Sequence, residues 1–217
     1  MLPMEATCSS APRDATLRRE RRRTRMRHEL AKVAVELFTK NGFEATTVDE
    51  IANVADYSES TFFRLFNRKE DVVFYDLPER IAAMRADFAS PNHHSAWTTI
   101  RNAFLNNART WETSDAEFAL ARVRLFHREP ALIARYLEYC LDWEDAVADI
   151  VAKERGAVSD SDLTSRLVAG SAVAAFRAAF RAHVADPGVG LTQHLESAFD
   201  ELERGLPVFQ RSKSHCP

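Results

Sequence analysis

The chain has 217 residues, of which 28% are charged, and only 6 are glycine and 8 are proline. So few turn-forming residues argue against a sandwich or barrel of strands and favour a mostly helical protein. No stretch is long and apolar enough for a transmembrane helix, and residues 1–14 lack the apolar run of a signal peptide, so we expect a cytoplasmic protein with no membrane partner.

Three cysteines stand far apart in the sequence, which argues against a disulfide framework or a zinc site. Cys8 and Cys216 lie in apparent tails. Cys140 lies in an apolar helical segment and is expected to be a small buried side chain.

Positive charge is concentrated near the N-terminus, although the formal net charge of the whole chain is −3. Residues 1–69 hold 13 Lys and Arg against 10 Asp and Glu. Between residues 13 and 27, arginines face only Asp14 and Glu20, and such a run is either solvated or bound to a polyanion. Because residues 1–22 also lack apolar periodicity, we predict that they form a disordered, Arg-rich arm.

The first predicted helix begins near Thr24. Apolar residues from Leu30 to Phe38 recur at the spacing of one helical face. Asn41-Gly42 ends this helix at about 18 residues, because glycine readily takes the left-handed conformation that closes a helix.

Two short helices follow the first. Thr47 and Glu50 have the spacing of a capping box, which predicts a second helix of barely two turns. Ser58 is expected to cap a third short helix that buries Phe62 and Phe66.

A longer helix is predicted from Lys69 toward Phe88, with a kink or break around Asp76-Leu77 because Pro78 lies inside it. Further helices are predicted at about 95–111, 115–128, 130–154, 160–185 and 190–205. No alternation typical of strands is present, so we predict an all-α fold.

Residues 31–72 resemble the tetracycline-repressor (TetR) family closely. They contain, in order, N-G-F, T-T-V-D-E-I-A, S-E-S-T-F-F-R and F-N-R-K-E. The resemblance implies an N-terminal three-helix helix-turn-helix domain at 23–70, which binds double-stranded DNA, and a helical ligand-binding and dimerisation domain at 71–206. Residues 1–22 form the arm and residues 207–217 a tail.

In this family the third helix enters the major groove, and the short polar side chains on its outer face suit that role. Arg64 reaches either a phosphate or a guanine edge, and Phe63 presses on a thymine methyl or a sugar. Thr47 and Lys69 stand where the family touches the DNA backbone. The expected DNA-binding residues are Thr47, Ser58, Ser60, Thr61, Phe63, Arg64 and Lys69.

Two positions depart from the pattern of the family. Asp56 stands where glycine is usual in the turn, and it tolerates left-handed geometry better than most residues. Leu65 stands where many members have Tyr or His, and it cannot hydrogen-bond a phosphate. The Arg-rich arm is expected to compensate, either by non-specific attraction or by reaching the adjacent minor groove.

The resemblance further implies a small-molecule effector and a homodimer. The region 122–135 faintly resembles a subgroup that responds to acyl thioesters or other lipophilic metabolites, so we expect a lipophilic effector. The expected ligand-binding residues are Phe88, Phe104, Trp111, Phe126, Tyr139 and Trp143. In the family the last two helices form the dimer interface, with burial within one subunit as the alternative. The expected interface residues are Gly170, Ala174, Ala178, Leu195, Phe199 and Leu202.

The sequence therefore predicts a dimeric repressor that binds a palindromic operator and is released by its effector. One alternative is a DNA-binding accessory protein with no effector, and another is a helical enzyme. Enzyme motifs such as a Gly-rich phosphate loop, G-x-S-x-G and H-E-x-x-H are absent, so we expect no catalytic site and no cofactor. His93-His94 is expected to lie in a solvated loop rather than to bind a metal.

Overall fold

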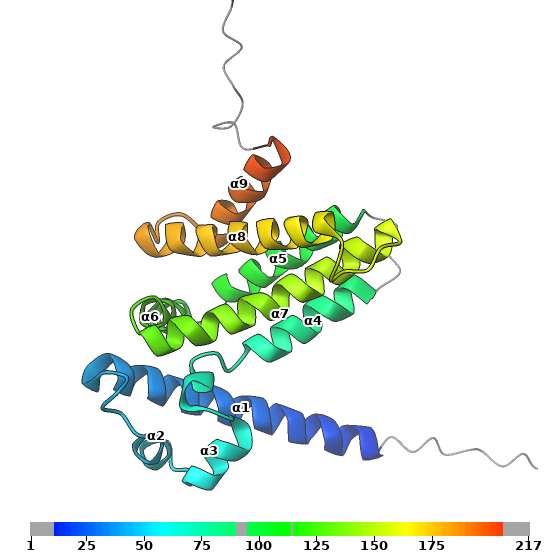
Figure 1. The fold of residues 1–217 in the computed structure, drawn as a ribbon. Coiled ribbons are helices and arrows are strands. Elements are labelled where there is room, and N and C mark those ends of the chain that lie inside the picture. Colours follow the sequence, from blue (N-terminus) through cyan, green and yellow to red (C-terminus); the bar gives the residue numbers. More distant parts are fainter. Residues whose placement is uncertain (1–10, 90–94, 114, 206–217) are drawn as a thin grey trace, which may run out of the picture. The chain divides into compact units, whose positions relative to one another are not determined.

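The computed structural model describes residues 11–89, 95–113 and 115–205, which form helices and, within these ranges, no strand (Figure 1). The predicted all-α fold class is thereby confirmed. The predicted tail 207–217, Cys8 and Cys216, and the pair His93-His94 lie outside the described residues. The chain divides into two compact units after Tyr75, a few residues beyond the predicted boundary at residue 70.

The first unit contains the three predicted helices, but the first of them is much longer than expected. Its helices are α1 (Ala11–Asn41), α2 (Val48–Val54), α3 (Glu59–Leu65) and the 3-10 helix η1 (Lys69–Val72). The prediction of a disordered arm is therefore wrong for residues 11–22. Ala, Arg, Glu and Leu are good helix formers, so the extension can continue a helix that is already nucleated by its packed half.

The core of the first unit is formed by apolar side chains of α1, α2 and α3. Leu30, Phe38, Ile51, Phe62 and Phe66 are all buried. Residues 15–25 of α1 are exposed, so this part of the helix is not held by apolar packing.

The second unit begins where the predicted long helix breaks. Residues 73–76 form a turn between η1 and α4, as expected from Pro78, which lies in the first turn of α4 where its missing N–H leaves no hydrogen bond unmade. The helices of this unit are α4 (Leu77–Ala89), α5 (Ala96–Glu112), α6 (Ala116–Phe126), α7 (Pro130–Arg155), α8 (Leu163–Ala185) and α9 (Leu191–Glu203).

An aromatic cluster occupies the centre of the second unit. The ring of Phe104 on α5 lies 5.8 Å from Trp143 on α7, 5.5 Å from Phe176 on α8 and 5.9 Å from Phe199 on α9, measured between centroids. Four helices therefore share one packed core. Arg101 also ties α5 to α9, since its guanidinium donates to Asp200 at 2.7 Å and to Glu203 at 2.9 Å.

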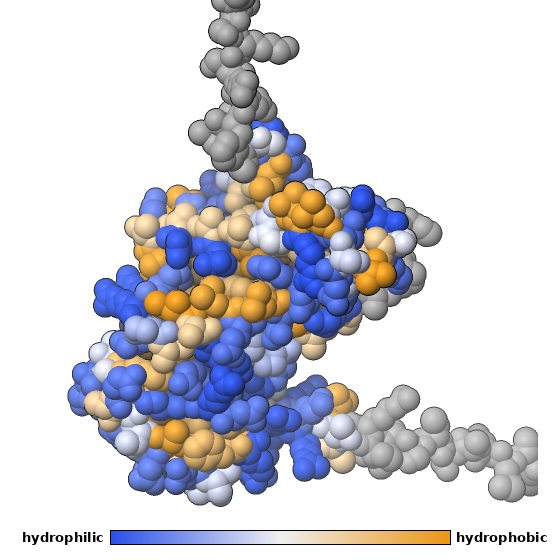
Figure 2. All heavy atoms as spheres, viewed as in Figure 1, coloured by the Kyte–Doolittle hydropathy of each residue, from blue (hydrophilic) through white to orange (hydrophobic). Residues whose placement is uncertain are grey.

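Part of the apolar surface of this unit stays uncovered within one chain. Figure 2 shows an apolar band along α7, to which Ile133, Leu137 and Leu141 contribute exposed side chains. Leu163 and Leu167 at the start of α8 are more exposed still. Over the described residues, no helix has the length and apolar character needed to cross a membrane.

Candidate nucleic-acid interface

Thr47 caps helix α2, as predicted. The Thr47 hydroxyl accepts a hydrogen bond from the backbone N–H of Glu50 at 3.1 Å, which is one half of the expected capping box. The Glu50 carboxylate accepts a hydrogen bond from the Asn41 amide at 3.1 Å. Glu50 therefore ties the start of α2 to the end of α1, a contact that the sequence did not predict.

The turn between α2 and α3 is held by Asp56 and Tyr57. Asp56 has a φ of 59°, the left-handed geometry expected where the family has glycine. The Tyr57 hydroxyl donates to the Glu29 carboxylate at 2.6 Å, and Arg25 donates to the same carboxylate at 2.8 Å. The hydrogen bond from Tyr57, followed by that from Arg25, lowers the pKa of Glu29. The charged carboxylate thus fixes the turn against α1.

The N-terminus of α3 carries a cluster of three hydroxyl groups. Ser58 caps the helix by accepting from the backbone N–H of Thr61 at 3.2 Å. Its hydroxyl also lies 3.0 Å from the hydroxyls of Ser60 and Thr61. Ser60 is exposed and Thr61 is half-buried, so these groups are held in place beside solvent.

Two phenylalanines fix the orientation of α3. Phe62 and Phe66 are buried, with ring centroids 5.1 Å apart, so the opposite side of the helix faces outward. Phe63 is 49% exposed and Arg64 is exposed. Figure 2 shows the apolar surface that α2 and α3 leave open, whose large members are Val54 and Phe63.

Lys69 has a structural partner that the sequence did not reveal. Its ammonium donates to the backbone oxygens of Phe43 at 2.8 Å and Thr46 at 3.0 Å. It also lies 4.1 Å from the centroid of the Phe43 ring. Since two of its three N–H groups are used in this way, Lys69 positions the loop between α1 and α2.

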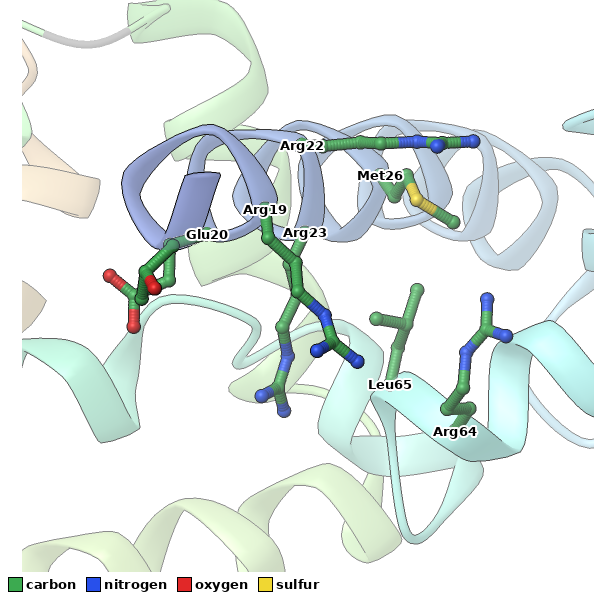
Figure 3. A pocket seen from close by; sticks show the side chains of 8 residues that line it. Arg19, Glu20, Arg22, Arg23, Met26, Arg64 and Leu65 are labelled. Atoms are coloured by element: carbon green, nitrogen blue, oxygen red, sulfur yellow. The ribbon is translucent and has the colours of Figure 1, made fainter. Parts of the chain in front are cut away.

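A groove of about 590 Å³ lies between the N-terminal half of α1 and helix α3 (Figure 3). Arginines make up four of the eight residues that line it. The lining residues are Thr16, Arg19, Glu20, Arg22, Arg23, Met26, Arg64 and Leu65. The sequence analysis placed Arg19 and Arg22 in a disordered arm, so it could not predict that they line a groove with α3.

The expected ligand-binding residues lie in the second unit, and the structure brings some of them together. Phe104 and Trp143 share the central cluster, where Trp143 is 2% exposed and its buried indole Nε1 has no hydrogen-bond partner among the described residues. Trp111 packs edge-on against Phe180, 5.0 Å between centroids.

The other three expected ligand-binding residues have different surroundings in the second unit. Phe126 stacks on Tyr136 at 4.8 Å, the Tyr139 hydroxyl accepts a hydrogen bond from Arg135 at 3.1 Å, and Phe88 is half-buried on α4. Burial raises the pKa of Tyr136 well above its usual value.

Sequence reasoning missed Phe176 and Phe180, which complete the aromatic cluster. They were read as part of a helix with a small-residue face. Their spacing of four residues places them on one side of α8, opposite the exposed Ala174 and Ala178, so a helical projection of this segment would have found them.

A buried charge cluster lies at the start of the second unit. The Asp76 carboxylate accepts from Arg122 at 2.5 Å and from Arg80 at 2.8 Å, and Arg80 also donates to the side chain of Asn107 at 2.8 Å. Burial favours the protonated acid, but the positive charges of Arg122 and Arg80 outweigh it and lower the pKa of Asp76 to about 2. The Arg122 guanidinium also lies 5.2 Å from the Trp111 ring. The cluster links α4, α5 and α6 to an aromatic side chain of the core.

Two of the expected interface residues do not lie on the surface. Leu195 and Phe199 are both 0% exposed within one chain, because the apolar stripe of α9 packs against α5 and α8. Their assignment to the dimer interface is wrong, and burial within one subunit is the correct reading. Ala174 and Ala178 are exposed, whereas Gly170 and Leu202 are half-buried.

Cys140 is buried, as expected, and burial raises the pKa of its thiol to about 11. In the part of the chain that the structure describes, no group of three or more His, Cys, Asp or Glu side chains is placed to hold a metal ion.

Comparison with family models gives two matches. Residues 30–75 match the model described as bacterial regulatory proteins, tetR family. Residues 94–207, just over half of the chain, match the model of the MftR C-terminal domain. The two matched segments correspond to the two compact units.

Among curated proteins, TcmR of Streptomyces glaucescens, an HTH-type transcriptional regulator, is 34% identical over 75% of this chain and 73% of its own length. MftR of Mycobacterium tuberculosis, a regulator named for mycofactocin biosynthesis, is 27% identical over 86% of this chain and 93% of its own length. Both names describe transcriptional regulators rather than enzymes.

Solved structures share the fold at lower identity. The Thermus thermophilus repressor FadR in complex with lauroyl-CoA has a TM-score of 0.56 at 23% identity, covering 88% of this chain and 98% of its own. The complex of SmeT with triclosan has a TM-score of 0.60 at 14% identity, covering 83% of this chain and 90% of its own.

Proposed function

Because the chain belongs to the tetR family of bacterial regulatory proteins, we propose that it is a dimeric, ligand-responsive transcriptional repressor. It binds a palindromic operator through the helix-turn-helix of its first unit and is released by a small lipophilic effector bound in its second unit. The observation that carries the proposal is the outer face of α3. There Ser60, Phe63 and Arg64 reach solvent from a helix that is capped at one end and anchored by buried rings.

The DNA-binding role follows from the size and rigidity of α3. A short helix with small polar groups at its N-terminus fits into a major groove about 12 Å wide, and the partial positive charge of that N-terminus attracts phosphate. Ser58, Ser60 and Thr61 supply hydroxyls there, while Phe63 supplies an apolar contact. Thr47 at the start of α2 offers a further hydroxyl to the DNA backbone.

The operator is identified by selecting bound duplexes from a random library and searching for an enriched palindrome. A dimer with its two α3 helices about 34 to 36 Å apart reaches successive major grooves, so half-sites one turn apart are expected. Enrichment of no sequence, or of single half-sites only, would contradict this proposal.

The effector site is supported by the aromatic cluster of the second unit. A buried donor without a partner costs roughly 1–3 kcal/mol, so the Trp143 indole N–H favours an effector with a hydrogen-bond acceptor and an apolar body. Structures of the same fold hold lauroyl-CoA and triclosan, both of which have large apolar parts. For this chain, Phe104, Trp111 and Trp143 are the residues proposed to contact the effector.

A thermal-shift screen with small apolar compounds separates this proposal from an accessory protein without effector. A compound that stabilises the protein must also lower the affinity of the protein for the operator. Operator DNA must then lower the affinity of the protein for the compound by the same factor. Compounds that stabilise the wild type but leave operator binding unchanged would favour the accessory protein.

Dimerisation is proposed to use the outer face of α8, where Gly170, Ala174 and Ala178 allow another helix to approach closely, with Leu202 of α9 at the edge. Replacing Ala174 with Glu would place an unpaired charge in the interface and should yield monomers. Sedimentation of the wild type as a monomer at micromolar concentration would refute the proposal.

A further inference from the structure

We propose that the groove between the N-terminal half of α1 and helix α3 holds the sugar–phosphate backbone of DNA, so that Arg64 contacts a phosphate rather than a base edge. The inference rests on the proposed function and deepens it. It assigns a role to the helical extension of α1 and decides between the two roles that the sequence leaves open for Arg64.

Positively charged side chains from both helices line the groove. Figure 3 shows Arg19 and Arg23 extending from α1 toward α3, and Arg64 extending from α3 toward α1. Guanidinium groups from two different helices thus point into one space. Glu20 is the only acidic residue among the eight that line it.

This arrangement of arginines is unfavourable in the absence of an anion. Arg19 is three residues from Arg22 and four from Arg23, and like charges at these spacings repel each other on a helix surface. Residues 15–25 are exposed, so no apolar burial offsets the repulsion. A run of phosphates between the two helices removes the repulsion and stabilises the extension.

The lining of the groove fits a DNA strand better than a small metabolite. Pockets for small metabolites are concave, mostly apolar and enclose most of their ligand. This groove is instead lined by exposed cationic side chains and lies against α3, the helix proposed to enter the major groove. One DNA strand borders each side of a major groove, so a strand beside α3 passes along the groove that Arg23 and Arg64 line. Met26 and Leu65 supply an apolar floor for the sugars.

This placement also accounts for Leu65. Its side chain cannot hydrogen-bond a phosphate where other members of the family have Tyr or His. The neighbouring Arg64, together with Arg19 and Arg23, provides guanidinium donors at the same end of α3, and each can hold a phosphate with two parallel hydrogen bonds.

The test compares two double variants of the full-length dimer that remove the same charge from the same helix. Arg19→Gln with Arg23→Gln removes arginines that line the groove. Arg18→Gln with Arg21→Gln removes exposed arginines that are not among its lining residues. Binding to the selected operator and to a scrambled duplex is measured by fluorescence anisotropy over a series of salt concentrations, and circular dichroism checks the helix content of both variants.

We expect the groove variant to reduce the slope of log affinity against log salt by about 3.6 on both duplexes, because the dimer loses four arginines and each lost phosphate contact contributes roughly 0.9. The control should change the slope by much less. Equal slopes for the two double variants would overturn the proposal, because they would show diffuse attraction instead of a groove. The salt dependence can be measured on the scrambled duplex even if the wild type prefers no operator. The absence of a preferred operator would refute the proposed function but not the role of the groove.

Arg64→Gln provides the second measurement. The proposal predicts the same fold-loss of affinity for the operator and for the scrambled duplex. A loss confined to the operator would show that Arg64 reads a base and would overturn the assignment. Pyrophosphate serves as a small-anion control: if it stabilises the wild type but not the groove variant at micromolar concentration, the groove is a small-anion site and the proposal fails.

Discussion

The two units of the chain are organised by contacts of different range. In the first unit, Ser58 caps α3 through Thr61, and Thr47 caps α2 through Glu50. The longer contacts there, from Tyr57 to Glu29 and from Lys69 to Phe43, span 28 and 26 residues. In the second unit, the decisive polar contacts join residues far apart in sequence, such as Arg101 with Glu203 and Asp76 with Arg122. A surface of fixed geometry can thus be built from a short motif, whereas a core able to enclose a ligand needs several helices at once.

The three tryptophans make this comparison measurable. Trp97, Trp111 and Trp143 all lie in the second unit. Tryptophan fluorescence therefore follows the second unit alone, while circular dichroism follows the helices of both. Variants matched in chemistry between the two units can then be compared.

The largest effects are expected from two buried phenylalanines, one in each unit. Phe66→Ala and Phe199→Ala each remove a buried ring and should cost about 3–5 kcal/mol of stability. Phe66→Ala should abolish DNA binding but should not change the denaturant concentration at which the tryptophan fluorescence of the second unit changes. Phe199→Ala should shift that transition to lower denaturant, because its ring contacts Trp97 and Phe104. A single shared transition in both variants would show that the units do not unfold separately.

A somewhat smaller effect is expected from Asp76→Asn, which leaves the buried Arg122 without its charged partner and should cost about 3 kcal/mol. Because the folded-state pKa of Asp76 is lowered to about 2 from 3.8, its contribution is present above pH 4 and is lost as the pH falls from about 4 to 2. Acid titration followed by tryptophan fluorescence should show this loss in the wild type. If Asp76→Asn has the same acid sensitivity as the wild type, Asp76 is not the group responsible.

The smallest effect is expected from two helix caps with the same chemistry. Ser58 and Ser95 each accept a hydrogen bond from a backbone N–H three residues later, at 3.2 Å, so Ser58→Ala and Ser95→Ala should each cost about 1 kcal/mol. Only Ser58→Ala should also weaken operator binding, because its hydroxyl orders those of Ser60 and Thr61. If the two variants bind the operator with equal affinity, the Ser58 hydroxyl has no role in DNA recognition.

Sequence reasoning succeeded where structure is decided locally. The cap at Ser58, the left-handed Asp56 and the buried Phe62 each follow from residues only a few positions away, and the structure confirms all three. The helices of the second unit were also found, since each has its own apolar periodicity.

Contacts between residues that are distant in sequence could not be predicted from the sequence. The backbone contacts of Lys69 join residues 23 and 26 positions apart, and no motif indicates them. The stripe of Leu195 and Phe199 was correctly seen as apolar, but periodicity cannot tell whether a buried face meets the same subunit or another. Residues 11–22 were assigned to disorder because they lack apolar periodicity, although a helix can extend on propensity alone once its neighbour is packed.

The central claim is that α3 reads a specific DNA sequence, and that an effector in the second unit controls this reading. Its most direct test is the affinity of the wild type for the selected operator relative to a scrambled duplex at about 0.15 M salt, with and without a compound that stabilises the protein. We expect a preference of about 10³ or more for the operator, in the range of specific regulators, and the loss of this preference when the compound is added. A preference below about tenfold, or one that the compound leaves unchanged, would contradict this claim.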